Sequence, residues 1–565
     1  MRLDKLTIGS AKESPSHQFK NLKDVTIDFD ERHWVTVVIG WNGTGKSNVL
    51  EALAIIFRDL IGKKKAPEFA YKLAYRMGTG DATQYILIDA DPDREKEPYI
   101  IHVATNDEAE GKGTLIPFIE GEERLSALRG KQIKFSAFIA EDQKHLPRYV
   151  FSYYSGESTR MHEVFRPYLE NYDGKLRKGE DPGLKRLFYA MPVHSQFVLL
   201  AFLIQQTDVV REFLDEHLGL DPDEGIESVL FVLRQPPWKS KEGDPRFWFA
   251  RGVVSDFLAK LYDIALAPIT LSRRVAASIW NEKKLEFKYL YVKDIASLRK
   301  LVGNQTPAKF FRDLESTYVS ELIEEVRIRV RLKKNDGSVT FRELSEGEQQ
   351  LLTVLGLLRF TAEEESLFLL DEPDTHLNPR WDVDYLTYLK KFVGGNEQNQ
   401  ETSHIVFTTH NPLAVAELVK EQVQILVRAN ESRRIEARQP EIDPRGMGYA
   451  GIVTSDMFGL AAALDQHTLE LLESKRKLTL KSEPLNELER DELERLNLEL
   501  DGYGFRYAMR DPMFEEYLRA RYTYERACPE DMRIAKRPAQ ERRQLAKAIF
   551  EQAAEKVRQE QEAAA

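Results

Sequence analysis

A phosphate-binding loop near the start of the chain limits the fold more than any other sequence feature. Residues 40–47 read Gly-Trp-Asn-Gly-Thr-Gly-Lys-Ser and match the pattern G-x-x-x-x-G-K-[ST] in full. A β-branched run precedes the loop and apolar residues recur at helical spacing after it, which disfavours a glycine-rich turn without a ligand. Glycines let backbone N–H groups surround phosphates, Lys46 supplies a positive charge, and Ser47 offers a hydroxyl to magnesium. The candidate nucleotide ligands in this loop are Asn42, Gly43, Thr44, Gly45, Lys46 and Ser47.

A second stretch, residues 344–378, holds the other groups that such a loop needs for chemistry. It places Ser345 and Gly347 at the expected start of a helix, where free backbone N–H groups and the helix dipole favour an anion. A buried apolar strand then ends in Asp371, which can hold magnesium through water, and Glu372. Glu372 can polarise an attacking water as a general base, a role worth about 10²- to 10⁴-fold in rate. The two stretches together predict an ATPase whose site needs two copies of the chain, rather than a turn that merely follows a strand.

A histidine ends the next buried strand. Residues 404–409 read as this strand, and His410, Asn411 and Pro412 follow it. Asn411 can cap a helix that Pro412 begins. Because α/β sheets bind ligands at the carboxyl ends of their strands, we expect His410 to face the same crevice as the phosphate loop. A lone histidine is more often structural, but beside these motifs we predict that His410 senses the γ-phosphate.

Length and composition limit the number of domains, the kinds of partner and the compartment of the protein. The 565 residues correspond to roughly three to four domain-sized units. The net charge of -11 argues against a generally basic nucleic-acid coat. The single cysteine, Cys528, excludes an internal disulfide and a cysteine-based zinc site, and fits a reducing cytoplasm. The N-terminus lacks the apolar core of a secretory signal, and the longest apolar run, 197–204, is too short to span a bilayer. We therefore expect a cytoplasmic protein without a membrane segment.

The order of strand-like and helix-like patterns predicts an α/β fold, with a two-lobed head and two helical additions. Residues 1–155 form lobe I, which carries the phosphate loop and a β-rich subdomain, and residues 156–320 read as a helical insertion. The insertion lacks sustained heptads, so we expect no long coiled-coil arm. Residues 321–440 form lobe II, and residues 441–565 form a helical, strongly charged region. The strand-like runs expected in lobe I are 3–8, 25–29, 85–88, 99–103, 115–119, 133–138 and 149–153.

One strand-like run in lobe II, residues 326–332, alternates basic and apolar residues. The alternation projects four basic side chains from one face: Arg327, Arg329, Arg331 and Lys333. The sequence Asn-Asp-Gly at 335–337 predicts a hairpin turn after it. A basic strand face can contact nucleic-acid phosphates, but lysine and arginine also guard sheet edges against aggregation. Nucleic acid stays open as a partner, with edge protection the more frequent reason for such a pattern.

In their order along the chain, these motifs resemble those of the ABC-type ATPases of the RecF, SMC and overcoming-lysogenization-defect group. The resemblance rests on the phosphate loop, the Leu-Ser-x-Gly signature, Asp-Glu-Pro, Thr-His-Leu-Asn-Pro and the terminal histidine. It implies ATP and Mg²⁺ as cofactors, with Ser47 and Asp371 at the metal. The resemblance further implies that Glu372 activates the attacking water and that His410 senses the γ-phosphate.

The same resemblance implies a head-to-tail dimer. Ser345 and Gly347 would reach the ATP held by the opposite subunit, and His376 and Asn378 would lie in the loop that crosses the dimer. The signature departs from that of transporters, because Glu346 and Glu348 stand where transporters usually have glycine and glutamine, as in the RecF-type branch. No glutamine clearly ends a strand of lobe I to contact the metal, although residues 143 and 157, Gln and Glu, are candidates.

Two other departures narrow the function. The missing coiled coil argues against chromosome condensation or the tethering of broken ends. The C-terminal region lacks the glutamate and the Asp-x-Asp of a Toprim nuclease, so we expect that the chain does not cut nucleic acid itself. Without a membrane domain, a transporter motor is the less favoured reading.

The C-terminal region resembles, more loosely, the ATPase subunit of the Septu type of anti-phage system, which is also found beside retrons. The resemblance includes Asp511-Pro512 followed by Phe514, Tyr517 and Leu518. In that family an HNH nuclease subunit docks on the ATPase, and the ATPase forms homo-oligomers. The resemblance thus implies that ATP hydrolysis gates a separate nuclease in phage defence. Two alternatives remain: a RecF-like DNA-repair ATPase that binds DNA directly, and a low-turnover, ATP-bound scaffold or sensor.

Overall fold

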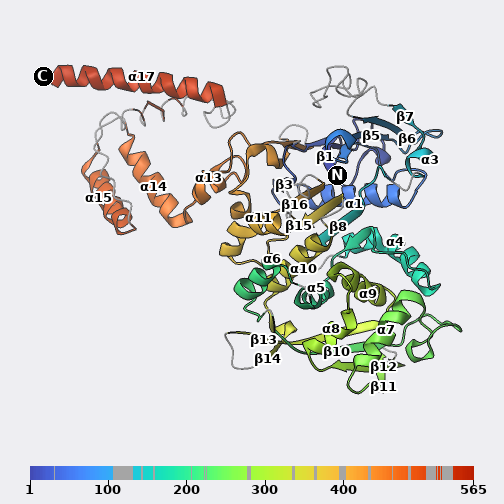
Figure 1. Cartoon of the computed structure of the whole chain (residues 1–565). Coiled ribbons are helices and arrows are strands. Elements are labelled where there is room, and N and C mark those ends of the chain that lie inside the picture. The colour runs from blue at the N-terminus through green and yellow to red at the C-terminus, as the bar shows by residue number, and fades with distance from the viewer. Residues whose placement is uncertain are drawn as a thin grey trace. The chain divides into compact units, whose positions relative to one another are not determined.

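The chain forms two compact units, Met1–Ile452 and Val453–Ala565. Figure 1 shows their elements in a computed structural model. No helix in the described part of the chain is both long and apolar enough to cross a membrane. The structure describes residues 1–564 except 31, 106–130, 141–143, 157–158, 205, 222, 224, 277–281, 334–337, 362–364, 394–401, 430–433, 461, 482–484, 504–516, 518–519, 522–523 and 525–538.

A seven-stranded sheet that carries the phosphate loop organises the first unit. Its order is β18-β17-β3-β16-β15-β8-β9, and all neighbouring strands run parallel except β17 and β18. The central strands are buried along their whole length, as parallel strands covered on both faces must be. This sheet confirms the predicted α/β class. Its strands are β3 (Val35–Gly40), β8 (Tyr149–Tyr154), β9 (Leu187–Tyr189), β15 (Ser366–Asp371), β16 (Ser403–Thr408), β17 (Val423–Arg428) and β18 (Ile435–Arg438).

A six-stranded antiparallel sheet, ordered β2-β1-β4-β5-β6-β7, shares one hydrophobic core with the seven-stranded sheet and with α1 (Lys46–Ile61). A buried histidine joins the two sheets: the Leu3 N–H donates to His404 Nδ1 at 3.1 Å, and Thr36 Oγ1 lies 3.1 Å from His404 Nε2. Burial lowers the pKa of His404 well below its usual value, so this ring is neutral and structural. The strands are β1 (Arg2–Ile8), β2 (Val25–Asp28), β4 (Tyr71–Met77), β5 (Gln84–Ala90), β6 (Tyr99–Thr105) and β7 (Lys131–Ile133).

One prediction about lobe I was wrong in detail, and one strand was missed. The run 133–138 is not one strand, because it splits into the end of β7 and one helical turn, α3 (Phe135–Phe138). Its two phenylalanines are three residues apart and lie on one side of that turn: Phe138 is buried, and Phe135 stacks on Tyr99 with 4.5 Å between ring centroids. Strand β4 was not predicted. The expected strand at 115–119 lies outside the described residues.

Residues 156–320 are not the purely helical insertion that we predicted, because they also supply most of a five-stranded antiparallel sheet, ordered β11-β12-β10-β13-β14. Most residues of the β11–β12 hairpin are exposed or only partly buried, so apolar alternation does not mark it in the sequence. Four helices, α5, α7, α8 and α9, contact this sheet. The strands are β10 (Ile226–Arg234), β11 (Ile269–Ala276), β12 (Glu282–Val292), β13 (Ile323–Arg331) and β14 (Ser338–Thr340).

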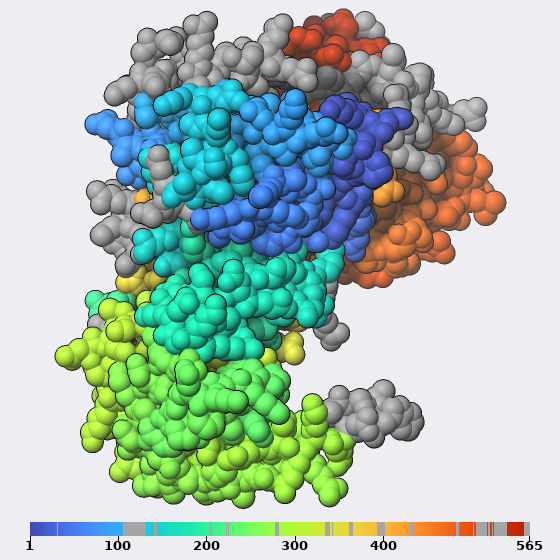
Figure 2. All heavy atoms as spheres, turned by 90° about the vertical axis from the view of Figure 1, so that its right-hand side faces the viewer, coloured from blue at the N-terminus to red at the C-terminus, as the bar shows by residue number. Residues whose placement is uncertain are grey.

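The helices of this region separate the five-stranded sheet from the rest of the first unit. Figures 1 and 2 show the sheet at the end of the unit opposite the six-stranded sheet, with α4 between the two. The predicted domain boundaries at 155, 320 and 440 stay predictions. The helices are α4 (Arg160–Arg177), α5 (Val193–Ile204), α6 (Asp208–Glu212), α7 (Gly252–Ile264), α8 (Ile295–Val302) and α9 (Pro307–Val319).

The helix behind the signature, α10 (Glu346–Thr361), packs tightly on α5 through a glycine. A Cβ on Gly356 would overlap the side chain of Val198, which is fully buried. We therefore expect Gly356→Ala to lower the free energy of unfolding by about 1–3 kcal/mol, because the helices must move apart. Val198→Ala in the same chain should restore part of this loss, and urea denaturation measures both. Equal losses in Gly356→Ala and the double variant would contradict this packing.

The second unit is helical, as predicted for the C-terminal region. Its own small core consists of Leu471, Leu496 and Leu500. On the last helix, Ile549 and Ala553 are buried one turn apart. The motif residues at 511–514 and 518 lie outside the described residues. The helices are α14 (Gln466–Thr479), α15 (Glu487–Gly502) and α17 (Ala539–Ala564).

Candidate nucleotide-binding site

The phosphate loop curls between β3 and α1, with two glycines in the left-handed region that side chains avoid. Gly43 has a φ of 81° and Gly45 a φ of 98°. A Cβ on Gly45 would lie 2.8 Å from Asn21 Oδ1, whereas no atom lies within 4 Å of a Cβ placed on Gly43. Thr44 Oγ1 donates to the Trp41 carbonyl at 2.8 Å and closes the turn. The loop is thus held in place at Thr44 and Gly45 and leaves free space beside Gly43, as a phosphate-binding loop requires.

Lys46 is held against this loop. Its Nζ donates to the Gly40 carbonyl at 2.9 Å, and the side chain is buried. Burial lowers the pKa of Lys46, while Glu372 and Asp371 act in the opposite direction. A cation in such a partly desolvated position interacts more strongly with a phosphate than one in water. Asn42 is exposed at the tip of the loop.

Asp371 receives two hydroxyl hydrogen bonds at the carboxyl end of β15. Ser47 Oγ donates to Asp371 Oδ1 at 3.0 Å, and Thr408 Oγ1 donates to the same oxygen at 2.5 Å. Asp371 is almost fully buried, which raises its pKa. Carboxylate and hydroxyl oxygens are the ligands that Mg²⁺ prefers. The two predicted metal ligands therefore lie together.

Glu372 and His410 face each other at the ends of two adjacent strands. His410 Nε2 lies 2.9 Å from Glu372 Oε1, and both side chains are partly exposed, by 43% and 29%. The hydrogen bond with His410 lowers the pKa of Glu372. Glu372 has a φ of 51°, and its N–H donates to Thr408 Oγ1 at 3.1 Å, so the neighbouring strand fixes this unusual turn. The turn thus orients the Glu372 carboxylate toward His410, and the hydrogen bond with His410 favours its ionised form.

The signature forms a capping box at the start of α10. The Ser345 N–H and Oγ–H both donate to Glu348 Oε2, at 2.7 and 2.8 Å, and the Glu348 N–H donates to Ser345 Oγ at 3.2 Å. A Cβ on Gly347 would overlap the His376 carbonyl. Gly347 thus lets the loop of His376 pass directly against the signature helix.

The segment expected to cross the dimer, which includes His376 and Asn378, leads directly into the helix that Asn378 caps. Asn378 Oδ1 accepts from the Trp381 N–H at 3.0 Å and caps α11 (Pro379–Val393). His376 Nδ1 lies 3.6 Å from Glu346 Oε2, and its ring is partly exposed. Asp374 is buried beside Thr409, and burial raises the pKa of Asp374 to about 6. In this chain Asn378 acts as a helix cap, while His376 is exposed next to the signature.

The predicted site residues thus form two separate groups within one chain. The phosphate loop, Asp371, Glu372 and His410 lie together, and Ser345, Gly347 and His376 lie together. Among the described residues, no hydrogen bond or ion pair joins the signature residues to the phosphate loop. The site shared across a dimer, which the resemblance implies, stays a prediction.

Sequence reasoning missed two residues that shape the first group. Asn21 Nδ2 donates to the Gly43 carbonyl at 3.0 Å, and Asn48 Nδ2 donates to Asn21 Oδ1 at 2.7 Å, so Asn21 ties the loop to α1. Thr408 contacts both carboxylate residues. Asn21 belongs to no motif, but the parallel pairing of β15 with β16 places Thr408 opposite Asp371. The metal-contacting candidates Gln143 and Glu157 lie outside the described residues.

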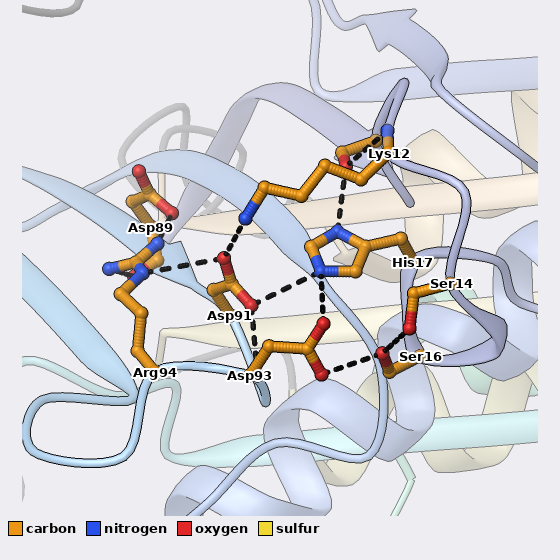
Figure 3. A network of polar contacts seen from close by, with 9 residues as sticks. Lys12, Ser14, Ser16, His17, Asp89, Asp91, Asp93 and Arg94 are labelled. Atoms are coloured by element: carbon orange, nitrogen blue, oxygen red, sulfur yellow. Dashed lines mark hydrogen bonds and ion pairs between the residues drawn. The ribbon is translucent and has the colours of Figure 1, made fainter.

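A polar network anchors the segment that carries Asn21 (Figure 3). His17 Nε2 lies 3.0 Å from Asp93 Oδ2 and 3.3 Å from Asp91 Oδ1, and Lys12 Nζ donates to Asp91 Oδ2 at 2.9 Å. Arg94 Nε lies 3.6 Å from Asp91. Although His17, Asp91 and Asp93 have ligand atoms close enough for a metal ion, Lys12 and Arg94 already balance the Asp91 carboxylate, and Ser16 and His17 bond Asp93. We assign the network to holding residues 12–17 against the turn after β5.

Two family models match the chain. The model described as "AAA ATPase domain" matches residues 17–110, and the model described as "AAA domain, putative AbiEii toxin, Type IV TA system" matches residues 239–416. The Septu protein PtuA of Bacillus mycoides (strain KBAB4) is 26% identical over 200 residues. That match covers 34% of this chain and spans only 27% of the length of PtuA.

Similar solved structures include the SMC head domain from Thermotoga maritima. It is 12% identical with a TM-score of 0.29, over 78% of this chain and 99% of that one. The crystal structure of Stu0660 of Streptococcus thermophilus is 12% identical with a TM-score of 0.24, over 90% of this chain and 95% of that one. The assignment of the head fold rests on the strand order and on the position of the motifs at the strand ends.

Proposed function

We propose that this chain, which has an ABC-type ATPase head and is similar to the Septu protein PtuA, hydrolyses ATP at two sites shared between head-to-tail subunits. The observation that carries the proposal is the pair Glu372–His410, 2.9 Å apart, beside the pair Ser47–Asp371 at the end of the same sheet. The first pair suits water activation and the second suits a metal ion, and both adjoin the phosphate loop.

The reaction needs a base that is ionised at neutral pH. The hydrogen bond with His410 favours the carboxylate form of Glu372, which can then accept a proton from the water that attacks the γ-phosphate. Lys46 and the loop N–H groups hold the phosphates in place. Magnesium, when bound beside Ser47 and Asp371, supplies positive charge to the phosphate oxygens.

The second subunit supplies what the first lacks. Because Ser345 and Gly347 lie apart from the phosphate loop of their own chain, their helix N-terminus is available to the nucleotide of a partner copy. The Ser345 hydroxyl, which now bonds Glu348, would turn toward a γ-phosphate in the assembled dimer. ATP binding thus favours dimers, and hydrolysis releases them.

We further propose that this cycle gates a separate nuclease in phage defence. The similarity to PtuA and the resemblance of the C-terminal region to Septu ATPases support this part, with an HNH-type nuclease docking on residues 441–565. A homo-oligomer built from such dimers would couple several nuclease subunits to one ATP state.

Mixing two inactive variants tests the shared site. Lys46→Ala removes phosphate binding, and Ser345→Arg blocks the signature, so each protein alone should hydrolyse ATP at the background rate. After subunit exchange, half of the dimers contain one intact composite site, and the mixture should recover about a quarter of wild-type activity. Phosphate release measures this, and unfolding temperatures check that both variants fold. A mixture that stays at the background rate would show that the site is not shared. Wild type that binds ATP without releasing phosphate would instead support a scaffold or sensor.

A further inference from the structure

The five-stranded sheet packs one face against its helices, and its other face is partly exposed to solvent, although Val232 and Phe287 on that face are buried. The buried face consists of apolar residues such as Phe231, Leu290 and Val326, each at most 1% exposed. Helices α5, α7, α8 and α9 contact the sheet and lie on one side of it in Figure 1. Because side chains alternate along a strand, the residues between these core positions form the opposite face. None of the labelled helices covers that face in the described part of the chain.

The open face carries a row of arginines along β13. Arg327 and Arg329 are each 56% exposed, and Arg331 is exposed too. Two of them contact acidic neighbours: Arg327 lies 2.9 Å from Glu325, and Arg329 lies 3.7 Å from Glu227. The chain as a whole carries a net charge of -11, so this basic row stands out. A basic row in an acidic protein favours a polyanionic partner at this face.

Aromatic and apolar side chains lie beside the arginines on the same face. Leu230 of β10 is opposite both Arg327 of β13 and Tyr291 of β12, so the three form one line across the sheet. Tyr291 is 39% exposed. In the next line, Tyr289 of β12 is only partly exposed, and its hydroxyl accepts from Arg273 at 3.0 Å; it is opposite Ile269 of β11, which is exposed. Exposed rings next to cations are the surface on which unpaired bases stack while their phosphates contact arginine.

We propose that this open sheet face, defined by Arg327, Arg329, Arg331, Tyr289 and Tyr291, binds single-stranded nucleic acid. A flat sheet offers no helix to enter a duplex groove, whereas exposed rings need bases that are free to stack. The arginines of β13 and the tyrosines of β12 lie on either side of the central strand β10, and they match the backbone and the bases of one strand.

The same strands lead directly into the signature. Arg329 is paired with Thr340 of β14, and Thr340 donates to Glu343 Oε1 from its N–H at 3.2 Å and from its hydroxyl at 2.8 Å. Glu343 ends a short 3-10 turn two residues before Ser345. A strand bound on β13 therefore lies one hairpin from the helix N-terminus that meets ATP. We infer that bound nucleic acid alters ATP turnover, and this second step rests on the proposed function.

Binding is tested without ATP, so that it does not depend on hydrolysis. The probe is a dye-labelled oligothymidine of about 16 nucleotides, and its fluorescence anisotropy is recorded with the full chain. Arg327→Gln/Arg329→Gln should weaken binding at least about tenfold, because two charge-assisted contacts are lost. The matched control, Lys65→Gln/Lys96→Gln, removes the same charge from exposed positions of lobe I and should bind as wild type does.

Salt dependence and base stacking separate this face from general charge attraction. In the arginine variant, the slope of log K against log [salt] should fall by about 1.4, because each phosphate contact to a single strand contributes about 0.7. Tyr291→Ala should weaken binding to the oligothymidine about tenfold while leaving the slope unchanged. Equal losses in the arginine and lysine variants, or tighter binding of a duplex of the same length, would overturn the proposal. Binding without any effect on ATP turnover would overturn only the coupling.

Discussion

Glu372→Gln should lower the rate of ATP hydrolysis by about 10²- to 10⁴-fold, the usual contribution of a general base, while ATP still binds. Glutamine keeps the size of the side chain and can still bond His410, but it cannot accept a proton from water. Because Lys46, Ser47 and Asp371 are untouched, the variant should hold ATP and accumulate as a larger, ATP-bound assembly. Phosphate release and light scattering with and without ATP measure the two effects.

The control for this variant is Glu163→Gln, which changes a glutamate at an exposed position of α4. It should hydrolyse ATP at the wild-type rate. The acidic limb of the wild-type rate profile provides a second check. His410 lowers the pKa of Glu372 from 4.5, so the base stays ionised until the pH falls below that value. If Glu372→Gln retained most of the activity, Glu372 would not be the base.

The parts of the site that could be predicted from sequence are those fixed by backbone geometry. A phosphate loop needs glycines with positive φ, and Gly43 and Gly45 have it. Parallel strands end at one edge of their sheet, which brings Asp371, Glu372 and His410 together although about 40 residues of sequence separate the last two. In each case a local pattern dictates where the side chain must lie.

The parts that could not be predicted depend on partners distant in sequence. Asn21 contacts Gly43 because the loop between β1 and β2 folds back onto the phosphate loop, and no residue pattern in the sequence predicts that contact. The β11–β12 hairpin is largely exposed, so it lacks the alternation of apolar and polar residues that indicates a half-buried strand.

A buried ionic cluster outside the nucleotide site should contribute strongly to the stability of the fold. Glu315 of α9, Lys185 before β9 and His194 of α5 are each at most 2% exposed, and Lys185 and His194 both contact Glu315. His194 Nε2 lies 2.7 Å from Glu315 Oε2, and its Nδ1 accepts from the Met191 N–H at 2.7 Å, so Nε2 carries the proton that it donates to Glu315. Lys185 and His194 lower the pKa of Glu315 to about 2 against the cost of burial.

Removing only the carboxylate charge should therefore be costly. Glu315→Gln leaves the Lys185 ammonium buried without a counter-charge, and we expect the free energy of unfolding to fall by about 3–5 kcal/mol at neutral pH. Because the folded pKa of Glu315 lies below its ordinary value of 4.5, this stabilisation is complete above pH 4.5 and is lost as the pH falls toward 2. Urea denaturation at several pH values should show the gap between wild type and variant closing over that window.

The double variant Lys185→Met/Glu315→Gln decides whether the charge or the shape of the cluster matters. An apolar side chain in place of the ammonium removes the buried charge, so most of the stability lost in Glu315→Gln should return. If the double variant were as unstable as the single one, the cluster would act through packing around His194 and not through its charges.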